Sequence, residues 1–344
     1  MKAMVLPCVQ DMRENPTPLT LLHLPLPSLK EEEILVEVSV CGVCRTELDE
    51  IEGRTPPSLF PIVLGHEIVG KVVEKGKKVT RFAVGDRVGI AWIHSSCGAC
   101  RFCQEGRENL CAQFKATGRD AHGGYAEYAV VREPFAYPIP ASFSDEEAAP
   151  LLCAGAVGYR ALRLGNLHDG EVLAFSGFGA SAHLVLQTAR HLYPHSPLLV
   201  FTRSERERLF ALDLGALWAG DFEDLPPRSP QLVIDTTPAW KPVVMMLRRL
   251  ERGGRLIINA IRKEVTDREF LAKLDYAQDL WMEKTIQSVA NVTRRDVEEF
   301  LEVAVSIPLR PTVETFPLSE ANRALQELKA GIIRGAKVLR IRES

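Results

Sequence analysis

The chain has 344 residues, enough for two domains, and its 46% hydrophobic and 25% charged residues are typical of a globular protein. Its 42 Lys and Arg against 45 Asp and Glu leave a formal charge of −3, which excludes the basic excess of proteins that bind nucleic acid or anionic membranes. No apolar run is long enough for a membrane span, and the first residues lack the apolar core of a signal peptide. We therefore expect a cytoplasmic protein.

Three segments differ in their pattern of apolar residues. Residues 1–150 contain short β-rich runs, such as 34–40 and 68–73, broken by Gly and Pro, which predicts a barrel-like β domain. Residues 151–291 alternate strands with helices, which predicts parallel βαβ units in a doubly wound sheet. Residues 292–344 return to a strand, a helix and a last strand, and we expect this tail to rejoin the first domain. In the last two segments we expect strands at 172–176, 198–202, 232–235, 255–259, 312–316 and 337–341, and helices at 180–191, 205–214 and 319–329.

Half of the cysteines lie in one short stretch with regular spacing: Cys97, Cys100, Cys103 and Cys111. Four thiolates at such spacing can wrap one tetrahedral zinc ion, and a filled ligand set is typical of a structural site. An iron–sulfur cluster also takes four cysteines, and reduced buried cysteines in a loop are the ordinary alternative. The spacing favours a structural zinc lobe over about residues 95–113.

A second set of soft ligands is scattered along the chain. Cys41 and Cys44 stand in one motif, His66 in a Gly-His-Glu triplet, and Cys153 in an apolar run. Taken singly, a lone histidine is more often a surface or core residue than a ligand, and Cys153 would be a small buried hydrophobe.

Taken together, these motifs resemble the zinc-dependent medium-chain alcohol dehydrogenase family, over nearly the whole chain. The matching stretches are Cys-Gly-Val-Cys-Arg-Thr-Glu-Leu at 41–48, Gly-His-Glu at 65–67, Val-Gly-Asp-Arg-Val at 84–88, the four-cysteine lobe, Gly-Gly-Tyr-Ala-Glu-Tyr at 123–128, and Ala-Pro-Leu-Leu-Cys-Ala-Gly at 149–155. The resemblance implies a GroES-like β-barrel catalytic domain at 1–150, a Rossmann dinucleotide-binding domain at 151–291, and two zinc ions per chain.

The resemblance also implies the roles of individual residues at the catalytic zinc. The ligands carried over by motif are Cys44, His66 and Cys153, with the fourth position open for alcohol or water. Cys41 is the alternative to Cys44. In the family, however, the ligand directly precedes a basic residue or histidine, then Ser or Thr, then an acidic residue, and in this chain that run begins at Arg45. Glu67 resembles the acidic neighbour that tunes or transiently binds the metal.

The family relays the alcohol proton outward, first through a hydroxyl that Thr46 resembles. Many members place a histidine three residues later, where this chain has Asp49. The outer relay is therefore open among Asp49, water and direct exit to solvent.

The nucleotide fingerprint is Gly177-x-Gly179-x-x-Ala182, which follows a predicted strand and opens a predicted helix. Such glycines allow a tight turn and a close approach of pyrophosphate to the helix N-terminus. A glycine-rich turn without a ligand is the alternative, but the βαβ context and the dehydrogenase motifs favour nucleotide binding.

Cofactor choice is predicted from the end of the second strand, where NAD enzymes carry an acidic residue. This chain has Thr202, Arg203 and Ser204 there, with no carboxylate, and the Arg203 guanidinium can pair with a 2′-phosphate. We therefore expect NADP rather than NAD, although Arg203 could instead be a solvated residue at a helix start. Arg45 stands where family members place a basic group near the pyrophosphate.

The substrate is predicted only by class: a small primary or secondary alcohol, or the aldehyde or ketone in reverse. Trp92 resembles the bulky pocket residue of enzymes for small primary alcohols, with core packing as the alternative. A polyol or other zinc dehydrogenase of the same fold, a zinc-free quinone reductase and a non-enzymatic zinc-binding regulatory protein are the competing classes. The quinone reductases lack the ligands present here, and the open ligand trio with Thr46 argues against a regulatory protein. Members of the family are usually dimers or tetramers, so the resemblance implies a homodimer or homotetramer.

Overall fold

The computed structural model describes residues 1–342, which fall into two compact units. The first unit comprises residues 1–156, 292–305 and the chain from 310 onward, and the second comprises 157–291 and 306–309. No helix within residues 1–342 is both long enough and apolar enough to cross a membrane.

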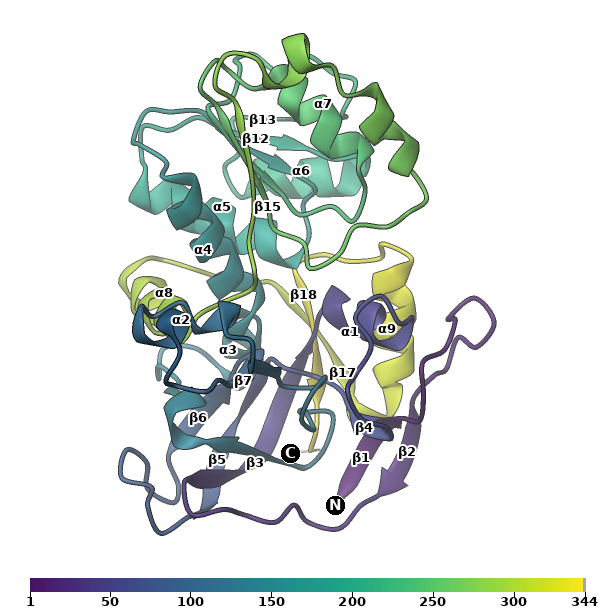
Figure 1. Cartoon of the computed structure of the whole chain (residues 1–344), viewed down its shortest axis with the longest axis vertical. Helices are drawn as coiled ribbons and strands as arrows, with labels where there is room; N and C mark the ends of the chain where they lie inside the picture. The colour runs from purple at the N-terminus through teal and green to yellow at the C-terminus, as the bar shows by residue number, and fades with distance from the viewer. Residues whose placement is uncertain (343–344) are drawn as a thin grey trace. The chain divides into compact units, whose positions relative to one another are not determined.

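The first unit is built on a seven-stranded sheet in the order β10-β6-β5-β3-β18-β17, with β9 also paired to β3. Its long central strand β3 pairs antiparallel with β5, β9 and β18, so the yellow C-terminal strands lie in the same sheet as purple β3 (Figure 1). The bounds are β3 Glu33–Val43, β5 Ile68–Lys75, β6 Arg87–Ile90, β9 Tyr128–Arg132, β10 Ala136–Pro138, β17 Val313–Pro317 and β18 Ala336–Arg340.

Smaller sheets and short helices complete this unit. One sheet has the order β2-β1-β4 and another pairs β7 with β8. These strands are β1 Lys2–Leu6, β2 Thr20–His23, β4 Ile62–Val63, β7 Ile93–Ser95 and β8 Lys115–Ala116. The helices are α1 Arg45–Ile51, α2 Arg101–Gln104, α3 Asp145–Ala148, α8 Arg294–Ser306 and α9 Ala321–Lys329, while α4 Ala154–Gly165 runs from this unit into the second.

The second unit is a six-stranded, wholly parallel sheet in the order β13-β12-β11-β14-β15-β16. Its strands are β11 Leu173–Ser176, β12 Leu198–Phe201, β13 Trp218–Gly220, β14 Leu232–Asp235, β15 Arg255–Ile258 and β16 Thr285–Ser288. Its helices include α5 Ala180–Leu192, α6 Glu205–Asp213 and α7 Lys241–Arg249.

The central strands of the parallel sheet are buried on both faces, as parallel strands require. Phe175 belongs to one apolar cluster with residues of α5 and α6, and Phe201 belongs to another with residues of α7. A β-rich unit and a doubly wound parallel sheet confirm the predicted fold class.

Candidate metal centres and nucleotide-binding turn

Four potential metal ligands from three separate segments converge in the first unit. Cys44 precedes α1, His66 and Glu67 lie between β4 and β5, and Cys153 directly precedes α4. Their ligand atoms all lie within 4.8 Å of one another, and His66 Nε2 is 3.3 Å from Cys153 Sγ. Two thiolates and an imidazole within this spacing fit a zinc ion with one protein position left open.

Glu47 holds this group together, although the sequence motifs did not single it out. Glu47 Oε1 lies 2.7 Å from His66 Nδ1, and Glu47 Oε2 accepts a 2.7 Å hydrogen bond from the Cys44 backbone N–H. Both side chains of the Glu47–His66 pair are fully buried. One carboxylate therefore directs His66 Nε2 toward the ligand group and fixes the start of α1 beside it.

The charges of the group depend strongly on one another. A hydrogen bond from the Cys153 thiol, together with the positive charge of His66, holds the pKa of Cys44 well below its usual range. Burial alone would lower the pKa of His66, but the negative charges of Glu47 and Cys44 raise it well above its ordinary value. A thiolate is therefore favoured at Cys44, which is the form that binds metal.

Glu67 packs against the backbone of β3 behind the ligands. A Cβ on Gly42 would stand 1.8 Å from Glu67 Oε2, so only glycine lets the carboxylate approach this closely. Burial, followed by the charge of Cys44, raises the pKa of Glu67 well above its usual range. Cys41 is buried on the same strand, where burial raises its pKa, and the ligand group among the described residues contains Cys44 instead.

The two residues expected to carry protons both lie on α1. Thr46 is buried, and its Oγ1 is 3.6 Å from Cys44 Sγ. Asp49 is buried too, and its Oδ1 accepts a hydrogen bond from Arg54 Nε at 2.5 Å. Arg54 is a partner that the sequence motifs did not indicate.

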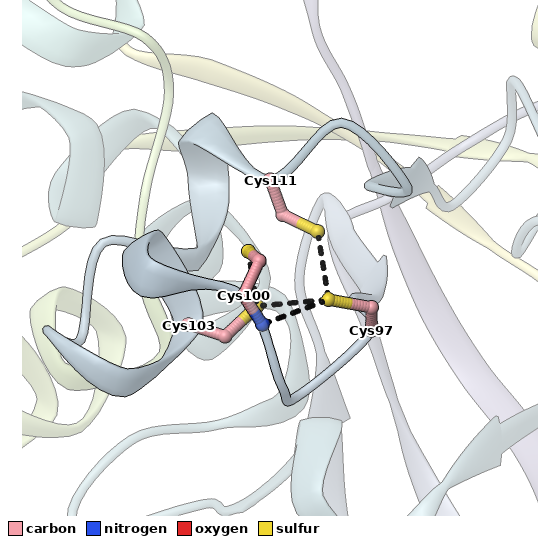
Figure 2. Close-up of side chains that lie close together, drawn as sticks. All are labelled: Cys97, Cys100, Cys103 and Cys111. Carbon is pink, nitrogen blue, oxygen red and sulfur yellow. Dashed lines mark hydrogen bonds between the residues drawn. The ribbon is translucent and has the colours of Figure 1, made fainter.

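The four cysteines of the lobe point their sulfurs toward a common centre (Figure 2). Neighbouring Sγ–Sγ distances are 3.8 Å for Cys97–Cys103, 3.6 Å for Cys100–Cys103 and 3.5 Å for Cys111–Cys97. Four sulfurs placed about 2.3 Å from a central zinc ion at tetrahedral corners would be about 3.8 Å apart. The spacing therefore fits one zinc ion.

Local backbone groups favour an anionic sulfur at Cys97. The Cys100 N–H donates to Cys97 Sγ at 3.3 Å, and backbone hydrogen bonds lower the pKa of Cys97 to about 6. The lobe is also tied to α8, because the buried carboxylate of Glu108 accepts hydrogen bonds from the backbone N–H and the Nε of Arg294, both at 2.9 Å.

The Gly177 turn joins β11 to α5 with the geometry that the fingerprint predicts. Gly177 has φ +83, Gly179 precedes the first residue of α5, and Ala182 is buried in that helix. A Cβ on Gly177 would meet Thr236 and Thr237 at about 3 Å, whereas a Cβ on Gly179 would meet nothing within 4 Å. The space at the helix N-terminus is open, which fits a pyrophosphate group.

A buried polar network supports this turn from β14. Asp235 accepts hydrogen bonds from Ser176 Oγ at 2.7 Å and Thr237 Oγ1 at 2.8 Å, and it also binds Lys263 Nζ. Lys263 donates further to the Thr237 carbonyl at 2.7 Å. The network fixes the loop that packs against Gly177.

The end of β12 differs from its sequence-based description in one respect. Thr202 is buried, Arg203 is exposed, and Ser204 caps α6 by accepting a 3.3 Å hydrogen bond from the Glu207 N–H. The Glu207 carboxylate folds back onto the Thr202 hydroxyl. A carboxylate does therefore stand at this strand end, supplied by the helix.

Trp92 lies between β6 and β7 and is 6% exposed. Its ring centroid is 4.9 Å from that of Phe114, and the Arg119 guanidinium lies 5.2 Å from the Trp92 ring. Arg45, the first residue of α1, is half-buried.

Known proteins resemble this chain in both sequence and fold. Residues 30–141 match the alcohol dehydrogenase GroES-like domain. The chain is 43% identical over 329 residues to "Probable alcohol dehydrogenase AdhA" of Mycobacterium tuberculosis, covering 94% of this chain and 93% of that protein. It is 33% identical to an alcohol dehydrogenase of Geobacillus stearothermophilus, covering 92% of this chain and 94% of that protein.

Two solved structures share the fold at lower identity. A CAD from Helicobacter pylori complexed with NADP(H) has a TM-score of 0.86 at 20% identity, covering 100% of this chain and 98% of that one. An NAD-dependent alcohol dehydrogenase has a TM-score of 0.86 at 24% identity, covering 99% of this chain and 100% of that one.

The fold and the two candidate metal-binding groups are those of a two-unit, zinc-type dehydrogenase architecture. The chain belongs to the zinc-dependent medium-chain alcohol dehydrogenase family, and its β-rich unit contains a GroES-like domain. The resemblance based on motifs is confirmed. Structures of this fold include one bound to NADP(H) and one described as NAD-dependent, so the fold does not determine which of the two cofactors is used.

Proposed function

We propose that the chain catalyses reversible hydride transfer between a small primary or secondary alcohol and a nicotinamide cofactor, with an aldehyde or ketone as the other partner. The observation that carries this proposal is the convergence of Cys44, His66 and Cys153 beside the Thr46 hydroxyl. A ligand trio with an open position is suited to catalysis, whereas a closed set of four is suited to structure.

Some residues around the trio position its ligands, and others transfer the substrate's proton. Zinc bound there would supply a Lewis acid that lowers the pKa of a substrate hydroxyl. Thr46 Oγ1 accepts the proton that this hydroxyl releases and passes its own proton outward. Glu47 keeps His66 Nε2 directed at the ligand group, and Glu67, which lies with the ligands, would tune or transiently bind the metal.

Asp49 is our proposed next acceptor in the relay. Burial raises the pKa of Asp49, while its hydrogen bond to Arg54 opposes the rise. A raised pKa makes a carboxylate a stronger proton acceptor than an unperturbed one. Water and direct exit to solvent stay as alternatives.

The lobe of Cys97, Cys100, Cys103 and Cys111 is proposed to hold a structural zinc ion, because all four tetrahedral positions are filled by thiolates. Zinc binding there contributes directly to folding of the lobe. The stoichiometry of the proposal is therefore two zinc ions per chain.

NADP is our proposed cofactor, with pyrophosphate at Gly177 and Gly179, α5 packed through Ala182, and Arg45 as a further basic contact. The exposed Arg203 guanidinium, beside Thr202 and Ser204, offers a planar donor to a 2′-phosphate. Trp92 is proposed as a wall of the substrate pocket. A homodimer or homotetramer and a cytoplasmic location stay predictions.

An assay of alcohol oxidation with both cofactors tests the function. The purified chain is mixed with a panel of small alcohols and either NADP or NAD, and the absorbance of reduced nicotinamide is followed. We expect alcohol-dependent reduction that Cys153→Ser abolishes and that Cys8→Ser, which changes an exposed cysteine, leaves unchanged. Absence of alcohol-dependent reduction across the panel in zinc-loaded protein would contradict the proposal.

A further inference from the structure

The carboxyl ends of β11 and β12 lie side by side at the nucleotide-binding turn. Ser176 pairs in register with Phe201, and the Gly177 N–H donates to the Phe201 carbonyl at 2.8 Å. Thr202, the next residue, is therefore adjacent to the glycine turn. In nucleotide-binding βαβ units the adenosine ribose lies at this second strand end.

A carboxylate is held at the same point. The Thr202 hydroxyl donates to Glu207 Oε2, and Ser204 caps the Glu207 backbone N–H. Arg208 Nη1 donates to the carbonyls of Thr202 at 2.9 Å and of Arg203 at 3.1 Å. These contacts fix the backbone between β12 and α6, so Glu207 is positioned by its surroundings rather than free in solvent.

The Glu207 carboxylate keeps acceptor capacity. Within residues 1–342, its only hydrogen-bond partner is Thr202, which occupies Oε2 and leaves Oε1 able to accept. Burial raises the pKa of Glu207, whereas the Thr202 hydrogen bond and the charge of Arg203 oppose that rise. An anionic acceptor and an exposed cationic donor, Arg203, thus share one strand end.

We propose that Glu207, held by the Thr202 hydroxyl, accepts a hydrogen bond from an adenosine-ribose hydroxyl of the cofactor and limits the preference for NADP. The inference rests on the proposed nicotinamide cofactor binding at the Gly177 turn. A carboxylate attracts a ribose 2′-hydroxyl and repels a 2′-phosphate, so Glu207 and Arg203 act in opposite directions on the same choice. Cofactor selectivity is set by this pair, not by the strand-end residue alone.

The test measures binding of two adenosine fragments by calorimetry, using the full-length, zinc-loaded chain. 2′,5′-ADP carries the 2′-phosphate, and 5′-AMP carries the bare ribose. Glu207→Gln keeps the shape and an oxygen for Thr202 but removes the charge. We expect its affinity for 2′,5′-ADP, relative to 5′-AMP, to rise about tenfold, and the kcat/KM ratio for NADP over NAD to rise in parallel.

Glu205→Gln is the matched control. Glu205 is the first residue of α6 and is exposed, and at 100° per residue it lies about 200° around the helix from Glu207. The same loss of one charge at Glu205 should change the affinity ratio by no more than about twofold. Equal effects of the two variants, or an unchanged ratio in Glu207→Gln, would overturn the proposal.

The same titrations separate this inference from the choice of NADP. If the native chain binds 5′-AMP better than 2′,5′-ADP but Glu207→Gln shifts the ratio as expected, NADP preference is wrong and the role of Glu207 stands. If the native chain prefers 2′,5′-ADP and Glu207→Gln leaves the affinity ratio unchanged, NADP preference stands and the role of Glu207 is wrong. If neither fragment nor either cofactor binds, both proposals are overturned.

Discussion

Glu47 joins the start of α1 to the histidine of the proposed catalytic zinc site, the ligand group of Cys44, His66 and Cys153, which is called the catalytic group below. Its two carboxylate oxygens have different partners, His66 Nδ1 and the Cys44 backbone N–H, and the side chains of Glu47 and His66 are fully buried. A ligating imidazole depends on such a partner for its tautomer and its orientation. In the proposed site, Glu47 would therefore position a zinc ligand without being a ligand itself.

Glu47→Gln should weaken zinc binding at the catalytic group by about 10- to 100-fold, because the amide keeps the shape but loses the charge that orients His66. Zinc competition with a chromogenic chelator measures the change, and added zinc should restore part of the activity. The structural zinc is the internal control, since the four-cysteine lobe contains none of these residues. Unchanged affinity at the catalytic site would contradict the positioning role.

Thr46→Val should lower kcat by about 10²-fold and alter its pH profile, because valine preserves the shape of threonine and removes the hydroxyl. Thr46→Ser retains the hydroxyl and should keep most of the rate. The measurement is the pH dependence of kcat for the three proteins. A native-like profile in Thr46→Val would remove Thr46 from the relay.

The sequence predicted which residues could ligate metal more easily than which residues support them. Cys44, His66 and Cys153 were assigned by motif, and the structure brings them together. Glu47 was visible as an acidic residue three positions after Cys44, but only the fold shows that it reaches a histidine in another segment. The sequence did not predict a carboxylate at the end of β12, because Glu207 belongs to α6 and only the fold shows that its side chain reaches Thr202.

At the scale of elements, long periodic segments were predicted closely. The helix expected at 180–191 is α5, Ala180–Leu192, and the strand expected at 255–259 is β15, Arg255–Ile258. β16 was not predicted because Ile286 is its one apolar residue, so the apolar alternation of a half-buried strand is absent, and all four of its residues are exposed. α4 was missed too, and its sequence contains three glycines, which lower helix propensity.

His183 gives α5 a pH-dependent contribution to stability. The side chain is fully buried, and burial lowers its pKa from 6.5 to about 4. As pH falls, His183 therefore binds a proton near pH 6.5 in the unfolded chain but only near pH 4 in the folded chain. The stabilisation is complete above the unfolded pKa, and about 3 kcal/mol of it is lost as pH falls through this window.

His183→Leu should reduce the fall in thermal midpoint between about pH 7 and pH 5, since leucine cannot take up the proton. His191→Gln on the same helix, at an exposed position, is the control and should behave as the native chain does. Differential scanning calorimetry of the three proteins at matched zinc content provides the comparison. Parallel curves for the native chain and His183→Leu would refute the assignment.

At the scale of the whole molecule, the last strand completes the first sheet. β18 pairs with β3 through contacts such as Leu339 with Cys41, which are nearly the whole chain apart in sequence. The strand itself was predicted from its local pattern. Its partner depends on long-range pairing, for which local sequence carries little information.

Substitutions in the two candidate metal-binding groups should have different effects on stability and on activity. Cys100→Ser should lose one zinc ion and chiefly lower the thermal midpoint, because a structural zinc contributes to folding. Cys153→Ser should lose the other ion and the activity while keeping most of the stability. Equal loss of stability in both variants would contradict a division into structural and catalytic sites.

Zinc content measured together with alcohol turnover tests the central claim most directly. The native chain should hold two zinc ions, one for each ligand group, and should oxidise a small alcohol with a nicotinamide cofactor. Cys153→Ser should hold one zinc ion and show no turnover. Full turnover in Cys153→Ser, or in native protein stripped of both ions, would contradict a zinc-dependent alcohol dehydrogenase built on Cys44, His66 and Cys153.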